Sequence, residues 1–223
     1  MLMIVQNDPE VPPGLIAELL HDKAVPFRLM RLYSEGHSSD FTVARGVIVL
    51  GGIMSVRDTV QFPFLQELKG RIGEVVRSGI PYLGVCLGGQ LLAEVLGGGV
   101  HLQERGERGC HQIELTEQGE LDPLFAGVPR LFTSFQWHSD SFDLPPEAVH
   151  LARTDTCPFQ AFRWGETAYG LQFHPEVTPR IVSEWSSATK HQSIGVPDAF
   201  KAAEAAYRAA SLTLLSNFLK MVP

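Results

Sequence analysis

The chain has 223 residues, enough for one large α/β domain or two small ones and for a sizeable buried core. Hydrophobic residues make up 44% and charged residues 19%, which are proportions typical of a globular protein. The net charge of -7 and the scattered lysines and arginines disfavour a nucleic-acid backbone or an anionic membrane as the main partner. The longest apolar stretches, such as 46–54, fall far short of the roughly 20 residues that a membrane span requires.

The first ten residues contain no cationic segment and reach acidic residues early, so they do not have the pattern of a secretory signal. The cysteines are Cys86, Cys110 and Cys157. An odd number at wide spacing favours reduced thiols over a disulfide framework. We therefore expect a cytoplasmic protein.

Short apolar runs alternate with helical patterns through the first half of the chain. Strands are expected over 3–6, 27–32, 46–50 and 80–85, and helices over 12–21, 64–76 and 90–96. The run at 46–50 is continuously apolar, as expected of a parallel strand that is covered on both faces. This alternation predicts right-handed βαβ units around a parallel sheet.

Long helices are not indicated between residue 99 and the C-terminal region. Apolar runs at 113–115, 131–135, 149–152, 161–164 and 169–173 predict antiparallel strands that extend the sheet or build a second small one. Residues 198–219 are rich in alanine and place apolar side chains near one face, which predicts a C-terminal amphipathic helix. We expect a single α/β domain over 1–223, with a mostly parallel central sheet, flanking helices and a smaller antiparallel region.

Cys86 stands between an expected strand and an expected helix, with Gly84 and Gly88 two positions to either side. This Gly-x-Cys-x-Gly pattern is the cysteine version of the nucleophile elbow, in which glycines relieve the crowding of a very tight turn. The positive end of the helix would favour a thiolate, and the backbone N–H of Leu87 would point to a developing oxyanion. The alternative is a buried structural cysteine in a glycine-rich turn.

A cysteine nucleophile needs a base, and the base needs a group that orients it. The segment 170–176 offers both, because His174 ends an apolar strand and Glu176 follows two residues later. Pro175 biases His174 toward an extended backbone. Residues two apart in an extended chain point the same way, so the carboxylate of Glu176 can reach the imidazole of His174.

No metal or cofactor site is indicated by the sequence. His101, His111 and His150 stand in strand-like segments without an evident carboxylate partner, and no zinc-ligand spacing occurs. Cys110 precedes His111, but adjacent residues in a strand face opposite ways, so we interpret this pair as structural. The glycines at 97–99 are interpreted as a helix stop rather than a phosphate-binding loop. We expect neither a metal nor a cofactor.

The segments 84–90 and 169–177 resemble the two signature segments of class I glutamine amidotransferases, most of all the glutaminase domain of GMP synthetase and its free-standing relatives. The resemblance covers roughly residues 1–185. It implies a flavodoxin-like fold with Cys86 as the nucleophile, His174 as the base and acid, and Glu176 as the orienting residue.

Two further segments agree with this family in order and spacing. Residues 47–55 resemble the glycine loop that supplies a second oxyanion donor, although Ile53 stands where many such loops have proline. Residues 136–140 resemble the loop that holds the α-amino and α-carboxylate groups of the substrate. The resemblance therefore implies oxyanion contacts from Gly52 and Leu87, and glutamyl contacts from Gln90, His138, Ser139 and Asp140.

Three hypotheses remain open at this point. The chain is a glutaminase that releases ammonia to a separate synthase partner; a free-standing hydrolase of γ-glutamyl peptides or metabolites; or a non-catalytic binding protein with the same fold. The two enzymes share one acyl-enzyme mechanism and differ in leaving group and partner. The intact set of cysteine, histidine and glutamate argues against the third hypothesis. The segment 190–197 and the C-terminal helix follow the histidine strand, where we expect them to line the leaving-group side.

Overall fold

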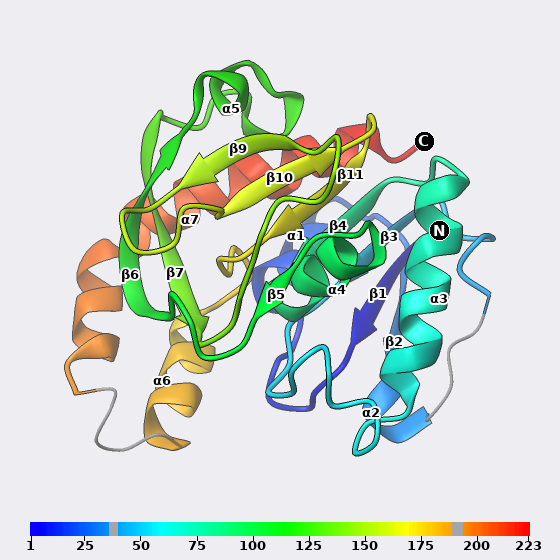
Figure 1. Ribbon diagram of the computed structural model, residues 1–223. Coiled ribbons are helices and arrows are strands. Elements are labelled where there is room, and N and C mark those ends of the chain that lie inside the picture. Colours follow the sequence, from blue (N-terminus) through cyan, green and yellow to red (C-terminus); the bar gives the residue numbers. More distant parts are fainter. Residues whose placement is uncertain (36–39, 189–193) are drawn as a thin grey trace.

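The computed structural model describes residues 1–35, 40–188 and 194–223 (Figure 1). Its main sheet has the strand order β2-β1-β3-β4-β11-β10-β9-β6-β7, and β5 pairs with β8 in a second, small sheet. The strands are β1 (Leu2–Gln6), β2 (Phe27–Arg31), β3 (Gly46–Val49), β4 (Tyr82–Val85), β5 (Val100–His101), β6 (Glu107–Leu115), β7 (Leu131–His138), β8 (Ser141–Phe142), β9 (Val149–Arg153), β10 (Ala161–Trp164) and β11 (Ala168–Leu171).

The helices lie on both faces of the main sheet (Figure 1). They are α1 (Gly14–Asp22), α2 (Leu32–Glu35), α3 (Phe64–Arg77), α4 (Leu87–Val95), α5 (Glu117–Leu121), α6 (Pro179–Ala188) and α7 (Val196–Met221), with a 3-10 turn at Pro123–Phe125. Apolar side chains of α1, α6 and α7 share one core cluster, and those of α3 and α4 share the other. The strands β1, β3, β4 and β11 are buried along their whole length because helices cover both of their faces.

The α/β fold class is confirmed, with a parallel half of the sheet that runs β2-β1-β3-β4-β11. The pairs from β11 through β10, β9 and β6 to β7 are antiparallel. The run at 169–173 was expected to be an antiparallel strand. This is correct for the pairing of β11 with β10 and wrong for its pairing with β4, which is parallel. The turn after β10 returns the chain to the centre of the sheet, so β11 completes the parallel half.

The structure differs from several of the helix predictions. The helix expected from residue 90 begins at Leu87, directly after Cys86. The C-terminal helix runs over Val196–Met221 and is longer at both ends than 198–219. Helix α6 was not predicted, although Ile181, Val182 and Trp185 are buried at helical spacing and a proline stands at its first position.

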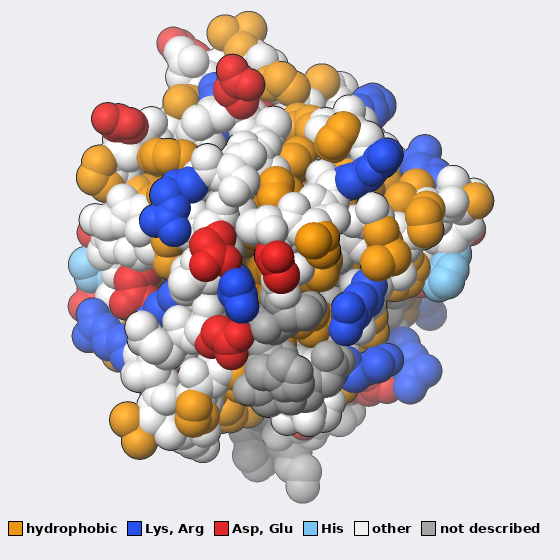
Figure 2. Space-filling model, turned by 90° about the vertical axis from the view of Figure 1, so that its right-hand side faces the viewer, with side chains coloured by type: hydrophobic (Ala, Val, Ile, Leu, Met, Phe, Trp, Pro, Cys, Tyr) orange, Lys and Arg blue, Asp and Glu red, His pale blue; other side chains and the backbone are white. Residues whose placement is uncertain are grey.

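Charged side chains of both signs are interspersed on the face shown in Figure 2, and neither sign forms a continuous area among the described residues there. None of the helices in the described ranges combines the length and the apolar character that crossing a membrane would require.

Two helical glycines offer a test of how closely α4 packs on the sheet. An added Cβ at Gly88 would collide with the carbonyl oxygen of Val49, whereas one at Gly70 of α3 would meet open space. We expect Gly88→Ala to lower the free energy of unfolding by about 1–3 kcal/mol. Gly70→Ala should raise it by about 0.5–1 kcal/mol, because alanine favours the helix. Urea denaturation measures both, and equal stability of the two variants would contradict this packing.

Candidate active site

Cys86 occupies a sharp turn between β4 and α4. Its backbone angles are φ 50° and ψ -107°, outside the conformations that a side-chain-bearing residue usually adopts. Two backbone hydrogen bonds hold it there, from its N–H to the carbonyl of Leu171 (2.8 Å) and from the N–H of Gln90 to its carbonyl (2.9 Å). An added Cβ at Gly84 would collide with the carbonyl of Gly88, so the turn requires glycine before the cysteine. The nucleophile-elbow geometry is thus present.

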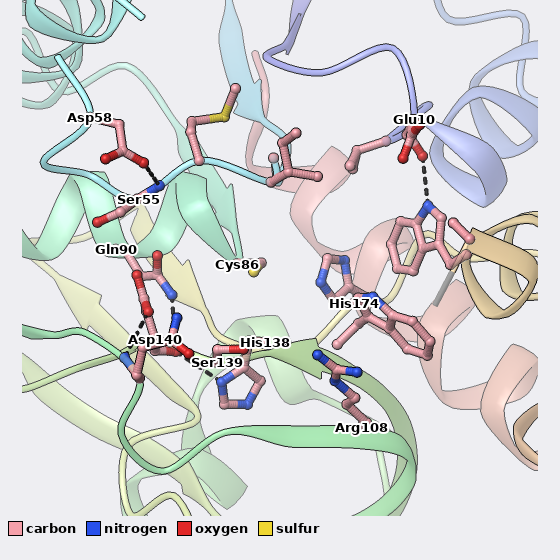
Figure 3. A pocket seen from close by; sticks show the side chains of 18 residues that line it. Glu10, Ser55, Asp58, Cys86, Gln90, Arg108, His138, Ser139, Asp140 and His174 are labelled. Carbon is pink, nitrogen blue, oxygen red and sulfur yellow. Dashed lines mark hydrogen bonds between the residues drawn. The ribbon is translucent and has the colours of Figure 1, made fainter. Parts of the chain in front are cut away.

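His174 and Glu176 follow β11, the parallel neighbour of β4, so they come to the same sheet edge as Cys86. The Nδ1 of His174 lies 2.7 Å from Oε1 of Glu176, and the two side chains are only 3% and 1% exposed. This contact places the Nδ1 proton toward the carboxylate and leaves Nε2 for other chemistry. Figure 3 shows the His174 ring turned toward Cys86, and Nε2 has no hydrogen-bond partner of normal geometry among the described residues.

The electrostatic surroundings favour a charged imidazole. Burial by itself would lower the pKa of His174, but the charge of Glu176, the neighbouring Cys86 and the hydrogen bond to Glu176 raise it to about 10. A charged imidazole beside Cys86 would favour a thiolate there. This is the protonation state from which a thiolate attacks and an imidazolium then donates its proton.

The backbone around His174 is fixed from three sides. The N–H of His174 donates to the carbonyl of Phe135 in β7 at 2.8 Å. The buried hydroxyl of Tyr207 in α7 donates to the carbonyl of His174 at 3.0 Å. The N–H of Leu15, at the start of α1, donates to the carbonyl of Glu176 at 2.8 Å. Since three separate elements hold this turn, the ring position does not depend on one contact alone.

The glycine loop after β3 packs against the pair. A Cβ added at Gly51 would lie 3.2 Å from Cε1 of His174 and 3.6 Å from Cβ of Cys86. Gly52 lines the cavity, and Leu87 is the first residue of α4, so its N–H has no partner within that helix. The predicted oxyanion donors therefore stand on the two chain segments that border Cys86, and their role stays a prediction.

The residues predicted for the glutamyl end gather on the other side of Cys86 (Figure 3). The side-chain amide of Gln90 donates to the carbonyl of Asp140 at 3.2 Å. The ring of His138 is 1% exposed, with Nδ1 2.9 Å from the same carbonyl and Nε2 3.4 Å from Glu107. The His138 ring thus fixes the loop from inside, and it borders the cavity together with Gln90, Ser139 and Asp140.

One group of potential metal ligands lies behind this loop. Among the described residues, Glu107, His138 and Cys157 have ligand atoms within 4.8 Å of one another. Glu107 already accepts hydrogen bonds from Thr154 (2.7 Å) and Gln160 (2.5 Å). Burial and the charge of Glu107 raise the pKa of Cys157 to about 12, so the Cys157 side chain stays a neutral thiol. We interpret the group as a hydrogen-bonded support for the His138 loop.

Two histidines do have carboxylate partners, contrary to the sequence-based expectation. The Nε2 of His101 lies 2.5 Å from Asp143, and Nδ1 of His111 lies 3.6 Å from Glu107. Asp143 stands 42 positions along the chain from His101 and reaches it through the β5–β8 pairing, which local sequence does not reveal.

The cavity has a volume of about 350 Å³ and includes a wall that the sequence did not predict. The ring centre of Trp185 in α6 lies 5.1 Å from that of His174, and the ring centre of Trp137 in β7 lies 5.9 Å from that of Trp185. The Arg108 guanidinium lies 5.4 Å from the centre of the Trp137 ring, and the two residues are directly paired across β6 and β7. Trp137 lies within the segment 136–140, which was assigned to the site, so its position in that motif could have indicated that it borders the cavity.

The prediction for 190–197 falls partly outside the described residues, which resume at 194. Helix α7 does reach the site through Tyr207. The placement of this segment on the leaving-group side stays a prediction.

Similarity to known proteins agrees with this geometry. The family profile of class I glutamine amidotransferases matches residues 15–184. The chain belongs to this family. One of the subunits of the glutamine-hydrolyzing GMP synthase of Pyrococcus abyssi is 43% identical over 100 residues, covering 44% of this chain and 52% of that protein. A putative glutamine amidotransferase-like protein of Salmonella typhimurium is 34% identical over 139 residues, covering 61% of this chain and 58% of that one. The match thus spans little more than half of these relatives.

Solved structures extend the likeness to the whole chain. A glutamine amidotransferase from Thermotoga maritima superposes with a TM-score of 0.88 at 28% identity, covering 99% of this chain and 97% of that one. A glutamine amidotransferase from Methylobacillus flagellatus has a TM-score of 0.90 at 24% identity, covering 100% and 95%, and so shares the fold.

The three cysteines should differ sharply in reactivity. Burial raises the pKa of Cys110, and burial with the charge of Glu107 raises that of Cys157 to about 12, whereas Cys86 borders the cavity beside an imidazolium. Iodoacetamide at neutral pH should therefore modify Cys86 first, as measured by peptide mapping over time. Labelling of Cys110 ahead of Cys86 would contradict the assignment.

The charge of Glu176 should set the alkaline limit of activity. Glu176→Gln keeps a hydrogen-bonding group but removes the charge that raises the pKa of His174 to about 10. Above its pKa the imidazole is neutral and cannot protonate a leaving group, so the alkaline limb of kcat/KM should move to lower pH. We also expect kcat to fall on the order of 10²- to 10⁴-fold. Glu184→Gln, an exposed change on α6, is the control, and an unshifted limb in Glu176→Gln would assign the orienting role elsewhere.

Proposed function

We propose that this chain is a glutaminase of the class I amidotransferase type, which cleaves the γ-glutamyl amide of glutamine through an acyl-enzyme on Cys86. The observation that carries the proposal is the buried His174–Glu176 contact of 2.7 Å, directed at a cysteine held at positive φ at the head of a helix. Family membership supports the same chemistry.

The proposed reaction has two half-steps. The Cys86 thiolate attacks the side-chain carbonyl of glutamine, and the C–N bond breaks as His174 gives its Nε2 proton to the departing nitrogen. Ammonia leaves, and a thioester remains. Water then gives a proton to His174 as it attacks the thioester, the C–S bond breaks, and glutamate departs from a restored thiolate.

The remaining predicted residues fit this scheme. The N–H groups of Gly52 and Leu87 stabilise the oxyanion that forms in each half-step, because the charge develops between their two chain segments. Gln90, His138, Ser139 and Asp140 hold the glutamyl end, and the His138 ring also keeps their loop in place. This division follows from the way the cavity is lined on either side of Cys86.

A separate synthase is the proposed acceptor of the ammonia. The similarity to the GMP synthase component of Pyrococcus abyssi supports this, since that protein is named as one subunit of a synthase. Ile53 at the cavity border is 76% exposed, and an exposed apolar side chain beside the mouth suits a docking contact. Hydrolysis of γ-glutamyl peptides or metabolites by the lone chain is the second candidate, and the tryptophan and arginine wall favours it.

A non-catalytic binding protein is disfavoured by the energetics of the site. A buried carboxylate and a buried imidazole, one nitrogen of which lacks a normal hydrogen bond among the described residues, both oppose folding, so their presence in a cavity favours a chemical role. A binding role for the cavity gives no reason to retain that arrangement beside a strained cysteine.

Glutamine hydrolysis by the purified chain tests the proposal. Glutamate and ammonia should form in equal amounts in the presence of EDTA, and at a higher rate when a synthase partner is added. Hydroxylamine should divert the acyl-enzyme to γ-glutamyl hydroxamate, because it competes with water for the thioester. Cys86→Ala should abolish all of these products, and His174→Ala should lower kcat about as much. Turnover by Cys86→Ala equal to that of the wild type would refute the mechanism.

A further inference from the structure

The side of the cavity that receives the leaving group is fixed by the proposed reaction, on which this inference rests. His174 protonates the departing nitrogen, so whatever that nitrogen carries must extend from Cys86 toward His174. The glutamyl end lies the other way, toward Gln90 and Asp140 (Figure 3). The residues beyond His174 therefore meet the leaving group and do not meet the glutamyl end.

Those residues form a continuous wall of two indoles and a guanidinium. The rings of Trp185 and His174 meet edge to face, Trp137 contacts Trp185, and the Arg108 guanidinium lies over the Trp137 ring. All three border the cavity. Arg108 lies on one side of His174 in Figure 3, with its guanidinium directed toward the ring, and Glu10 lies on the other side. The cation thus faces the space into which a leaving group would extend.

We propose that Arg108 is a specificity-determining residue that binds a carboxylate on the leaving amine, while Trp137 and Trp185 pack against the rest of it. The substrate class then includes, beside glutamine, γ-glutamyl compounds whose leaving group is an amino acid or short peptide. Arg108 is suited to the task because a guanidinium binds a carboxylate through two parallel hydrogen bonds and stacks on an indole. Its pairing with Trp137 across β6 and β7 fixes the base of the side chain.

Ammonia as the sole leaving group does not account for this wall. Ammonia needs neither a flat apolar surface nor a cation, and its protonated form is repelled by a guanidinium. The indole of Trp185 is itself held, since its Nε1 donates to the carbonyl of Glu10 at 2.6 Å. The wall is therefore a built surface, and its chemistry matches an anionic, partly apolar amine.

A matched pair of substrates isolates the carboxylate. γ-Glutamyl-phenylalanine and γ-glutamyl-2-phenylethylamine differ only by that group, and the ratio of their kcat/KM values measures its recognition. We expect the wild type to prefer the carboxylate-bearing substrate by about 10- to 100-fold. Arg108→Gln should bring the ratio near one, mainly through KM of the first substrate, and Arg108→Lys should retain part of the preference.

Arg180→Gln serves as the control, because it removes the same charge from an 86% exposed position on α6 and should leave the ratio unchanged. A wild-type ratio near one overturns the inference without any variant, and so does an equal loss on both substrates in Arg108→Gln. If the wild type forms γ-glutamyl hydroxamate from glutamine through Cys86 yet ignores the carboxylate, the proposed function stands and the inference about Arg108 is wrong. Failure on every γ-glutamyl compound removes both proposals.

Discussion

The parallel pairing of β4 with β11 is the constraint on which the site depends. Val85 lies opposite Leu171 in this register, so the chain leaves both strands at the same edge and at the same height. Cys86 follows one strand directly, and His174 follows the other after two residues. The backbone N–H of Cys86 donates to the carbonyl of Leu171, which couples the elbow to the histidine strand itself. A pairing shifted by one residue would turn His174 away from the cysteine.

This arrangement concentrates destabilising features at one sheet edge. A cysteine at positive φ, a buried carboxylate and a buried imidazole each oppose folding when taken alone. Their mutual attraction offsets part of that effect, since Glu176 and the neighbouring Cys86 together outweigh burial and raise the pKa of His174. The rest comes from the surroundings, where β7, α1 and α7 hydrogen-bond to the backbone of this turn. Helix α7 therefore belongs to the support of the site through Tyr207, although it lies far from Cys86 in the sequence.

The sequence predicted best those features that depend on neighbours in the chain. The elbow needs only the glycines around Cys86 and the strand and helix that flank it, and all of these lie close together in the sequence. The His174–Glu176 contact needs only an extended backbone between the two. Helix α6 was missed although its buried residues have helical spacing, because its amphipathic pattern is short and directly follows a series of strands. The parallel pairing of β11 with β4 was not predicted, because no local sequence pattern marks a strand that has one parallel and one antiparallel neighbour.

Features that depend on strand pairing could not be predicted from local sequence. Arg108 reaches the cavity because β6 pairs with β7, and Trp185 reaches it because α6 packs beside His174. The two halves of the cavity consequently have different origins. The proposed nucleophile, the proposed base and the glycine loop follow the central parallel strands, whereas the wall beyond His174 comes from the antiparallel extension and from α6.

The two halves of the cavity can vary separately. In the order of the sheet, β10 and β9 stand between β11 and the strands β6 and β7 that carry Arg108 and Trp137. Substitutions on the exposed side of β6 and β7 can therefore change the wall while β4 and β11 keep their register. The architecture thus separates the residues proposed for acyl transfer from those proposed to select the leaving group.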